Sequence, residues 1–415
     1  MTLCLMTLCL GLSVVAGCRQ PDPPVAGASA GEGLRWYRAS VVTADGASVP
    51  FFLSVPDGCD AAPALIVNGD ERIEVDCRQT EMQLLLEFPV WGTRIEAVPL
   101  ESGALEGSWI RPYMPEPEQS MAFRASPIAT PDPALRFADT LEGSPPAADL
   151  SGTWEMRFAE HGPAKGMLEQ TPGGVVDGTA AMPSEYGDLR FLAGTISGER
   201  LTMSTFDGQH AYLLEATRQG DGTLRGSFRC CEEIHDTFVA TRSEDFEVVS
   251  PLHQVQILSE DRHLELEALR DPKYDGKAVL VEIFGTWCSN CNDLAPLLTE
   301  LYDEHRDEGL EMLGIAFELT DDETYSQARL AAYREKHGLT WNLVLADDTP
   351  EALLSQGSVR FSAIEGVPVT IFLNRDRTVQ AVYAGFLGPA AGEAHMEAVA
   401  TFRELTRQIL DSPAS

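Results

Sequence analysis

Residues 277–296 read Lys-Ala-Val-Leu-Val-Glu-Ile-Phe-Gly-Thr-Trp-Cys-Ser-Asn-Cys-Asn-Asp-Leu-Ala-Pro. The apolar run Ala278–Phe284 is short and is followed by a glycine, so it predicts a strand that is buried on both faces. From Ser289 onward the apolar residues recur at helical spacing, which predicts a helix. The stretch therefore predicts a strand that passes directly into a helix, with Cys288 and Cys291 at the junction.

The two cysteines at this junction are suited to redox chemistry. The unpaired N–H groups and the positive dipole end of a helix N-terminus favour a thiolate, so we expect the pKa of Cys288 to be lowered. Cys291 follows one helical turn later, where its thiol can attack a mixed disulfide formed by Cys288. Glu282 lies within the apolar run, and burial should raise its pKa, which suits a group that accepts a proton from Cys291. Trp287, directly before the pair, is expected to cover the sulfurs and to shape access to them.

These residues resemble the motif of the thioredoxin fold. Glu282, Trp287, Cys288 and Cys291 stand where that fold has its buried acid, its tryptophan and its redox cysteines, and Pro296 stands where a proline kinks the redox helix. The resemblance implies that Cys288 attacks a disulfide and that Cys291 resolves the product. The dipeptide between the cysteines is Ser-Asn rather than the Gly-Pro of thioredoxin, and the buried acid is Glu rather than Asp.

A second segment extends this resemblance. Gly366–Thr370, with Pro368 at its centre, looks like the cis-proline loop of the fold. A cis peptide bond before Pro368 would expose the backbone of Val367 to a substrate and would keep metal ions from the sulfurs. Residues 250–410 are similar to the membrane-tethered, envelope-facing branch typified by TlpA and ResA. Some ResA-like proteins carry a second acid three residues after the resolving cysteine, but this chain has Leu294 there.

The composition narrows the classes of partner. The chain has 415 residues, enough for two or three domains, and 44% of them are hydrophobic, so each domain can build a core. The formal net charge of -34 argues against nucleic acids and anionic lipid surfaces as partners and is typical of a well-solvated exported protein. Nothing in the sequence points to a cofactor.

The first residues resemble a bacterial export signal. Residues 1–17 are apolar but too short for a stable membrane span, and they predict a signal peptide. The sequence Val-Ala-Gly-Cys at 15–18 resembles a lipobox, so Cys18 is the expected site of lipid attachment, although no Lys or Arg precedes it. The Pro-, Ala- and Gly-rich residues 18–33 predict a flexible tether. We therefore expect a lipid-anchored protein of the bacterial cell envelope that faces the periplasm.

Two β-rich regions follow the tether. Residues 34–125 contain short β-like runs and the hairpin signal Asn68-Gly69, which together predict a small all-β domain. Residues 126–148 hold five prolines and predict a linker. In residues 149–245, candidate strands about ten residues apart alternate with Gly-rich turns, which predicts a second β-domain, either a barrel or a sandwich.

The cysteines favour an oxidising compartment. The chain has nine, of which six remain once the signal peptide and the lipidated Cys18 are set aside. Cys59 and Cys77 flank the predicted hairpin, and a disulfide between them would stabilise the fold by about 3 kcal/mol in the loop-entropy model. Cys230 and Cys231 are the other candidates for structural disulfides. The run Cys-Cys-Glu-Glu-Ile-His that they begin could also bind a metal ion, but adjacent cysteines rarely point at one ion and no second ligand cluster is visible, so we expect no metal site.

Residues 250–415 alternate between strand-like and helix-like patterns. This alternation predicts a parallel sheet with antiparallel strands at its edge, preceded by a hairpin of Gln254–Leu258 and Leu264–Ala268. His305 and His337 are expected to be solvated helix residues. The predicted fold class is therefore multidomain, with N-terminal all-β regions (sandwich or barrel) followed by a C-terminal α/β thioredoxin-like domain.

The resemblance implies a membrane-anchored thiol-disulfide oxidoreductase that reduces or exchanges disulfides of envelope proteins, with electrons supplied by a membrane donor of DsbD or CcdA type. Two alternatives stay open. A peroxiredoxin-like thiol peroxidase shares the fold, but its threonine stands three residues before the reactive cysteine, whereas Thr286 stands two before Cys288. The other alternative is a binding module in the β regions, with the thioredoxin-like domain as an accessory.

Overall fold

A computed structural model describes residues 33–413, except for 44, 60–61, 115–118, 139–143, 183–186, 231–233, 347–348, 350–353, 355–356 and 365. The predicted signal peptide (1–17), lipid-attachment residue Cys18 and tether (18–33) thus fall outside the described residues, apart from Gly33. Residues 33–415 group into one compact unit. Among the helices of the described residues, none combines the length and the apolar character needed to cross a bilayer.

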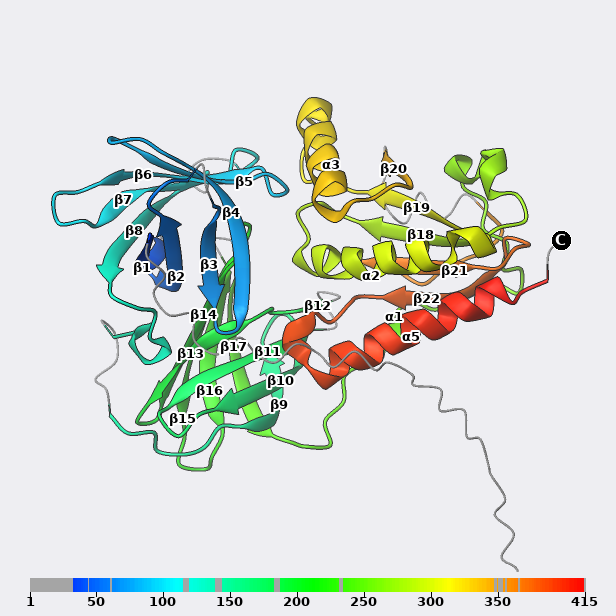
Figure 1. The fold of residues 1–415 in the computed structure, drawn as a ribbon. Helices are drawn as coiled ribbons and strands as arrows, with labels where there is room; N and C mark the ends of the chain where they lie inside the picture. Colours follow the sequence, from blue (N-terminus) through cyan, green and yellow to red (C-terminus); the bar gives the residue numbers. More distant parts are fainter. Residues whose placement is uncertain are drawn as a thin grey trace, which may run out of the picture. The chain divides into compact units, whose positions relative to one another are not determined.

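The first β region is a closed barrel of eight strands (Figure 1). Each strand pairs antiparallel with the next, and β8 pairs back onto β1. The turn between β3 and β4 contains Gly69, whose φ of 55° is accessible to glycine at little cost. β8 extends into the stretch that was expected to be a linker. The strands are β1 Leu34–Val42, β2 Ser48–Pro56, β3 Ala64–Asn68, β4 Glu71–Gln79, β5 Leu84–Phe88, β6 Thr93–Pro99, β7 Leu105–Ile110 and β8 Ser120–Ile128.

A disulfide joins the connection between β2 and β3 to β4. It links Cys59 to Cys77, which are 18 positions apart in the sequence. The bond closes the loop that holds the β3–β4 hairpin, so the position of Cys77 on β4 is tied covalently to the preceding connection.

The second β region also closes on itself. Its sheet has the order β10-β9-β17-β16-β15-β14-β13-β11-β12, and an additional pairing of β10 with β11 joins its ends, so the region is a barrel rather than a sandwich. Cys230 is buried at the end of β16, and Cys231 lies outside the described residues. The strands are β9 Gly152–Phe158, β10 Pro163–Gln170, β11 Val175–Met182, β12 Gly187–Asp188, β13 Leu192–Ser197, β14 Arg200–Phe206, β15 Ala211–Arg218, β16 Leu224–Cys230 and β17 Ile234–Arg242.

The turn between β14 and β15 packs into the core of the first barrel. Phe206 is fully buried, and its ring stacks on Phe51 at 4.4 Å between centroids and meets Trp109 edge-on at 5.0 Å. The backbone of the turn accepts hydrogen bonds from first-barrel side chains, because Trp91 Nε1 donates to Asp207 O at 3.0 Å and Trp109 Nε1 donates to Gly208 O at 3.1 Å. The two barrels therefore share a hydrophobic core.

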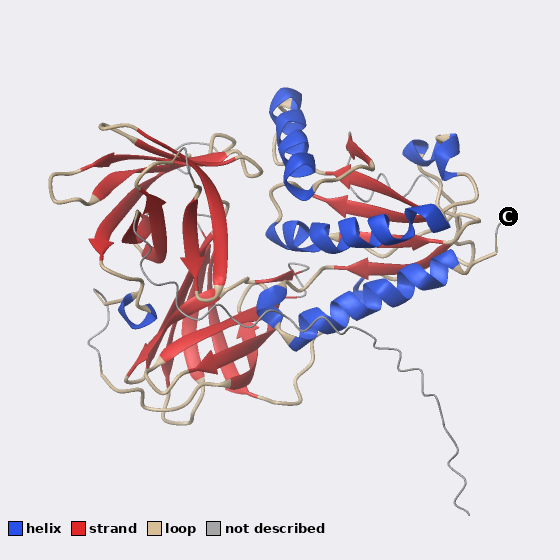
Figure 2. Cartoon of the chain, in the orientation of Figure 1, coloured by secondary structure: helices blue, strands red, loops and turns tan. Residues whose placement is uncertain are grey.

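The C-terminal region is an α/β fold that carries the long helices of the described chain (Figure 2). Its five-stranded sheet has the order β20-β19-β18-β21-β22, in which β18, β19 and β20 are parallel to one another, and β21 pairs antiparallel with both β18 and β22. All seven residues of β18 are buried, as expected for the central strand. The elements are α1 Pro251–Gln254, β18 Ala278–Phe284, α2 Ser289–His305, β19 Leu310–Ala316, α3 Glu323–His337, β20 Asn342–Leu345, β21 Val369–Leu373, β22 Val379–Ala384 and α5 Glu393–Leu410.

The leading hairpin expected from Gln254–Leu258 and Leu264–Ala268 is wrong. These two segments do not pair with each other. Both instead contact later parts of the chain: Ile257 forms an isolated bridge with Phe361, and Leu264 N donates to Arg377 O at 3.1 Å next to the bridge of His263 with Thr378.

Candidate active site

The cysteine pair lies where β18 passes into α2. Cys288 is the N-cap of α2, with extended φ and ψ of -82° and 120°, and its Sγ accepts a hydrogen bond from the backbone N of Cys291 at 3.1 Å. The two cysteines are joined by a disulfide. Cys288 is 6% exposed and Cys291 is fully buried, so a reactant can approach only the first sulfur. This arrangement allows thiol–disulfide exchange with Cys288 as the attacking or attacked atom.

A half-buried carboxylate holds the loop before Cys288. Glu318, just after β19, accepts hydrogen bonds from Thr286 N at 3.0 Å and from Thr286 Oγ1 at 2.8 Å. Burial raises the pKa of Glu318, while the two hydrogen bonds from Thr286 act in the opposite direction. Trp287 is half-buried, and its Nε1 donates to Phe317 O at 2.8 Å. Both residues that precede Cys288 are thus fixed by the end of the neighbouring strand.

Asn292 links the first turn of α2 to α3. Its Nδ2 donates to Thr286 O at 3.2 Å and to Cys288 O at 3.0 Å, while its Oδ1 lies 2.9 Å from Nε2 of His337. Burial, together with the smaller effect of the charge of Lys336, lowers the pKa of His337 to about 3, so the imidazole is neutral at neutral pH and can donate to Asn292. The expectation that His337 is only a solvated helix residue is therefore wrong.

Glu282 lies on β18 behind the cysteine pair. It is 1% exposed, and neither of its carboxyl oxygens has a hydrogen-bond partner in the described residues. It stands across from Gly314 on β19 and from Thr370 on β21. Burial raises its pKa to about 8, so the carboxyl holds a proton at neutral pH.

The loop before β21 contacts the Sγ atom of Cys288. The peptide bond between Val367 and Pro368 is cis, and Val367 O lies 3.7 Å from Cys288 Sγ. On the other side of the pair, the hydroxyl of Tyr333 on α3 donates to Cys291 O at 3.0 Å. The structure thus brings Glu282, Trp287, Cys288, Cys291 and Pro368 into one region around the β18–α2 junction.

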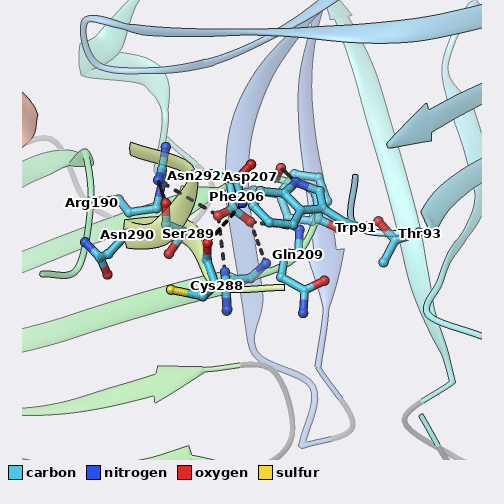
Figure 3. A network of polar contacts seen from close by, with 12 residues as sticks. Trp91, Thr93, Arg190, Phe206, Asp207, Gln209, Cys288, Ser289, Asn290 and Asn292 are labelled. Atoms are coloured by element: carbon cyan, nitrogen blue, oxygen red, sulfur yellow. Dashed lines mark hydrogen bonds and ion pairs between the residues drawn. The ribbon is translucent and has the colours of Figure 1, made fainter. Parts of the chain in front are cut away.

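The second barrel also contacts this junction. Arg190 is 8% exposed, and its Nη1 donates to Ser289 O at 3.4 Å (Figure 3). The same Nη1 pairs with Asp293 Oδ2 at 2.8 Å. The carboxylate of Asp188 accepts hydrogen bonds from Asn290 Nδ2 at 3.5 Å and from Gly388 N at 2.6 Å. Burial and, to a smaller extent, the charge of Asp293 raise the pKa of Asp188 to about 6, against the opposing effects of Arg190 and of the hydrogen bond from Gly388.

The other cysteines that the sequence analysis singled out lie away from the β18–α2 junction or outside the described residues. Cys59 and Cys77 form their disulfide in the first barrel, and Cys230 ends β16. Cys18 and Cys231 are not among the described residues. In the part of the chain that the structure describes, no three His, Cys, Asp or Glu side chains gather in a way that could hold a metal ion.

Sequence reasoning missed Glu318, Asn292 and Arg190. Asn292 had a weak signal, since it follows Cys291 directly and is a polar residue in the first turn of a buried helix. Glu318 and Arg190 had none, because their partners lie 32 and 103 positions away in the sequence.

Residues 254–382 match the AhpC/TSA family. Among curated proteins, the chain is similar to the thiol-disulfide oxidoreductase ResA of Geobacillus kaustophilus, with 25% identity over 128 residues, which cover 30% of this chain and 65% of that protein. It is also similar to the ResA of Bacillus thuringiensis, with 32% identity over 62 residues, which cover 15% of this chain and 33% of that protein. The similarity thus spans less than two thirds of each relative.

Solved structures are similar to a part of the chain. A putative thiol:disulfide interchange protein DsbE from Chlorobium tepidum has 14% identity and a TM-score of 0.26, and the match covers 36% of this chain and 93% of that one. StoA from Bacillus subtilis has 16% identity and a TM-score of 0.23, and the match covers 32% of this chain and 84% of that one.

Proposed function

We propose that this chain, whose residues 254–382 form a thioredoxin-like domain of AhpC/TSA type, is a thiol-disulfide oxidoreductase. The observation that carries the proposal is the Cys288–Cys291 disulfide at the N-terminus of α2, with only Cys288 open to a reactant. The names of the ResA relatives support the same activity.

The reaction uses the groups around the junction in separate roles. When the pair is reduced, the helix N-terminus favours the thiolate of Cys288, which attacks a substrate disulfide. Cys291 then attacks the mixed disulfide and releases the reduced substrate. Burial raises the pKa of Glu282 to about 8, so only the ionised fraction of its carboxyl, which grows as the pH rises toward that value, can take the proton of the Cys291 thiol, directly or through water. Trp287 and the Val367–Pro368 peptide border the sulfur that reacts.

Two single substitutions test this proposal. Cys288→Ser should abolish reduction of a disulfide substrate by the purified protein, because no nucleophile is left at the accessible position. Cys291→Ser should retain the attack but accumulate a mixed disulfide, which mass spectrometry detects. The double variant Cys59→Ser/Cys77→Ser, which removes the remote disulfide, is the control and should retain activity. Full activity of Cys288→Ser would refute the mechanism.

A thiol peroxidase is the second candidate, and the AhpC/TSA match favours it. Against it, the hydroxyl of Thr286 donates to Glu318 at 2.8 Å, so it is already engaged and does not face a peroxide at Cys288. Consumption of hydrogen peroxide by the reduced protein separates the two. We expect it to be slow compared with disulfide reduction, and the opposite order of rates would favour the peroxidase.

We further infer that the protein is anchored by lipid at Cys18 and acts on disulfides of envelope proteins, with electrons returned by a membrane donor of DsbD or CcdA type. The lipobox-like residues 15–18 support the anchor. In cells, Cys18→Ala should abolish incorporation of labelled palmitate, and loss of the donor should leave Cys288 and Cys291 oxidised, as thiol alkylation would report. Unchanged labelling would exclude the anchor.

A further inference from the structure

One short segment of the second barrel covers the dipeptide between the cysteines. Asp188 accepts a hydrogen bond from the side chain of Asn290, and Arg190 donates to the backbone of Ser289. Gly187 lies so close to Asn290 that a Cβ at this position would overlap its amide. Ser289 and Asn290 are accordingly only 5% and 8% exposed. A substrate therefore cannot lie across this dipeptide while the barrel is in place.

The remaining approach to Cys288 is a cavity of about 200 Å³. Trp287, Val367 and Cys288 itself form the side that belongs to the α/β region. The opposite wall belongs to the second barrel, where Met182, Leu189, Tyr212 and Phe228 form its apolar part and His161, Asp188 and His210 form its polar part. Pockets that enclose drug-sized ligands measure roughly 300–1,000 Å³, so this cavity accepts only a small or slender group.

The barrel wall of the cavity is fixed and largely apolar. The rings of His210 and Phe228 lie 5.3 Å and 5.4 Å from that of Tyr212. The imidazole of His210 is oriented by Asp207, whose Oδ2 lies 3.2 Å from Nδ1, and that of His161 is oriented in the same way by Asp236 at 2.8 Å. This wall would meet the groups that flank the substrate sulfur, and it suits uncharged rather than strongly charged neighbours.

We propose that the second barrel is a substrate-selecting wall, which restricts the redox pair to a disulfide carried by an extended, cysteine-bearing peptide segment. A disulfide on the surface of a folded domain could not bring its sulfur to Cys288 without displacing the barrel. This inference rests on the proposed oxidoreductase function and adds the substrate class to it. Envelope proteins would then be reduced while the segment around the cysteine is unfolded.

The exchange at this wall consists of two thiol–disulfide steps. The Cys288 thiolate of the reduced protein attacks one substrate sulfur, the substrate S–S bond breaks, and the departing thiolate takes a proton from water. The Cys291 thiol then loses its proton and its sulfur attacks Cys288 Sγ, so the S–S bond between Cys288 and the segment breaks and the pair becomes the disulfide of the present structure. The segment leaves as a thiolate, which takes up one proton in place of the one that Cys291 released. The substrate gains two electrons, and a dithiol reductant restores the pair.

The test compares three probes that carry the same leaving thiol, N-acetylcysteine amide, in a mixed disulfide. The first partner is N-acetylcysteine amide itself, the second is a linear peptide of about ten residues with a central cysteine, and the third is folded ubiquitin with one surface cysteine. The full chain is reduced with dithiothreitol, freed of it, and mixed with each probe, and single-turnover rates are measured. We expect the peptide to react at least about tenfold faster than ubiquitin.

Substitutions at Tyr212 change the width of the cavity in opposite directions. Tyr212→Trp should lower the single-turnover rate with the peptide several-fold, because the larger side chain fills the cavity. Tyr212→Ala should reduce the ratio of the rate with the peptide to the rate with ubiquitin. Tyr302→Ala is the matched control, since this half-buried tyrosine packs on Trp341 away from the cavity, and its rates should equal those of the wild type.

The possible results distinguish a failure of the substrate-selecting wall from a failure of the proposed oxidoreductase function. Equal rates for peptide and ubiquitin, unchanged by both Tyr212 variants, would overturn the selecting wall but leave the oxidoreductase intact. A low-mass disulfide that reacts about tenfold faster than the peptide would assign the cavity to small molecules and would also overturn the proposal. If the reduced wild type reacts with no probe, or no faster than Cys288→Ser, the proposed function itself fails.

Discussion

Glu282 shows how burial of one residue couples chemistry to stability. Its carboxyl has no hydrogen-bond partner in the described chain, so only the neutral form is compatible with its surroundings on β18. The folded protein keeps the proton up to about pH 8, whereas an unfolded chain releases it near the ordinary value of 4.5. The folded state therefore binds more protons between these values, and stability must fall as the pH rises through this window.

We predict that Glu282→Gln removes this pH dependence. In the wild type, the contribution is fully present below pH 4.5 and is lost as the pH passes about 8, a difference of about 5 kcal/mol. Urea unfolding at several pH values between about 5 and 9 measures it, and the variant should show a flatter profile. Glu260→Gln, at an exposed position, is the control and should follow the wild type. A variant that loses stability above pH 7 as steeply as the wild type would contradict the buried-proton argument.

Some residues of the candidate site could be predicted from the sequence and others could not. Cys288, Cys291 and Glu282 could be predicted from the sequence, because their roles depend on neighbours in one short stretch, a strand followed by a helix. The role of Glu318 could not be predicted from the sequence, because only the parallel pairing of β18 with β19 brings it to Thr286. The pKa of His337 could not be foreseen either, since its burial depends on the packing of α3 against α2.

At the level of elements, the pattern of apolar residues predicted β18 and α2 well. The local sequences of β18 and α3 agree with their surroundings: β18 is buried throughout, and α3 begins at an Asp322 cap and ends at Gly338 with a φ of 64°. β12 could not be predicted, because it has only two residues and its place is set by β11 and by Asn290. The expected hairpin before β18 failed for the related reason that its segments pair with distant ones.

β12 provides the second prediction, because it has no room for a side chain at Gly187. A methyl group there would overlap the amide of Asn290 and would weaken its hydrogen bond to Asp188. We expect Gly187→Ala to lower the free energy of unfolding by about 1–3 kcal/mol. Gly220→Ala is the control, since no atom lies within 4 Å of a Cβ at that position, and it should change stability by less than about 0.5 kcal/mol. Equal denaturation midpoints for both variants would show that β12 does not press on the redox dipeptide.

At the scale of residues 33–415, the two barrels and the redox helix are joined by buried polar contacts. The turn that holds Phe206 and Asp207 lies in the first barrel's core, and Asp207 Oδ2 lies 3.6 Å from Nε of Arg190 (Figure 3). Arg190 in turn pairs with Glu71 of the first barrel at 2.5 Å and with Asp293 of α2 at 2.8 Å. No motif predicts such contacts, because each partner belongs to a different part of the sequence and none has a local signal.

Arg190 therefore carries the prediction for the whole molecule. Burial alone would lower its pKa, but the carboxylates of Asp293, Glu71 and Asp207 raise it, so the guanidinium stays charged. Arg190→Met would leave these carboxylates buried without their cation, which should cost about 3–5 kcal/mol. Because the lost pairs join separate regions, we expect calorimetry to split one unfolding transition into two, with the α/β region apart from the barrels. Arg94→Met, which removes a half-exposed ion pair with Glu96, is the control. It should unfold in one transition, with a free energy of unfolding within about 1 kcal/mol of the wild-type value. A single, unshifted transition in Arg190→Met would mean that the ion pairs of Arg190 are not what joins the α/β region to the barrels.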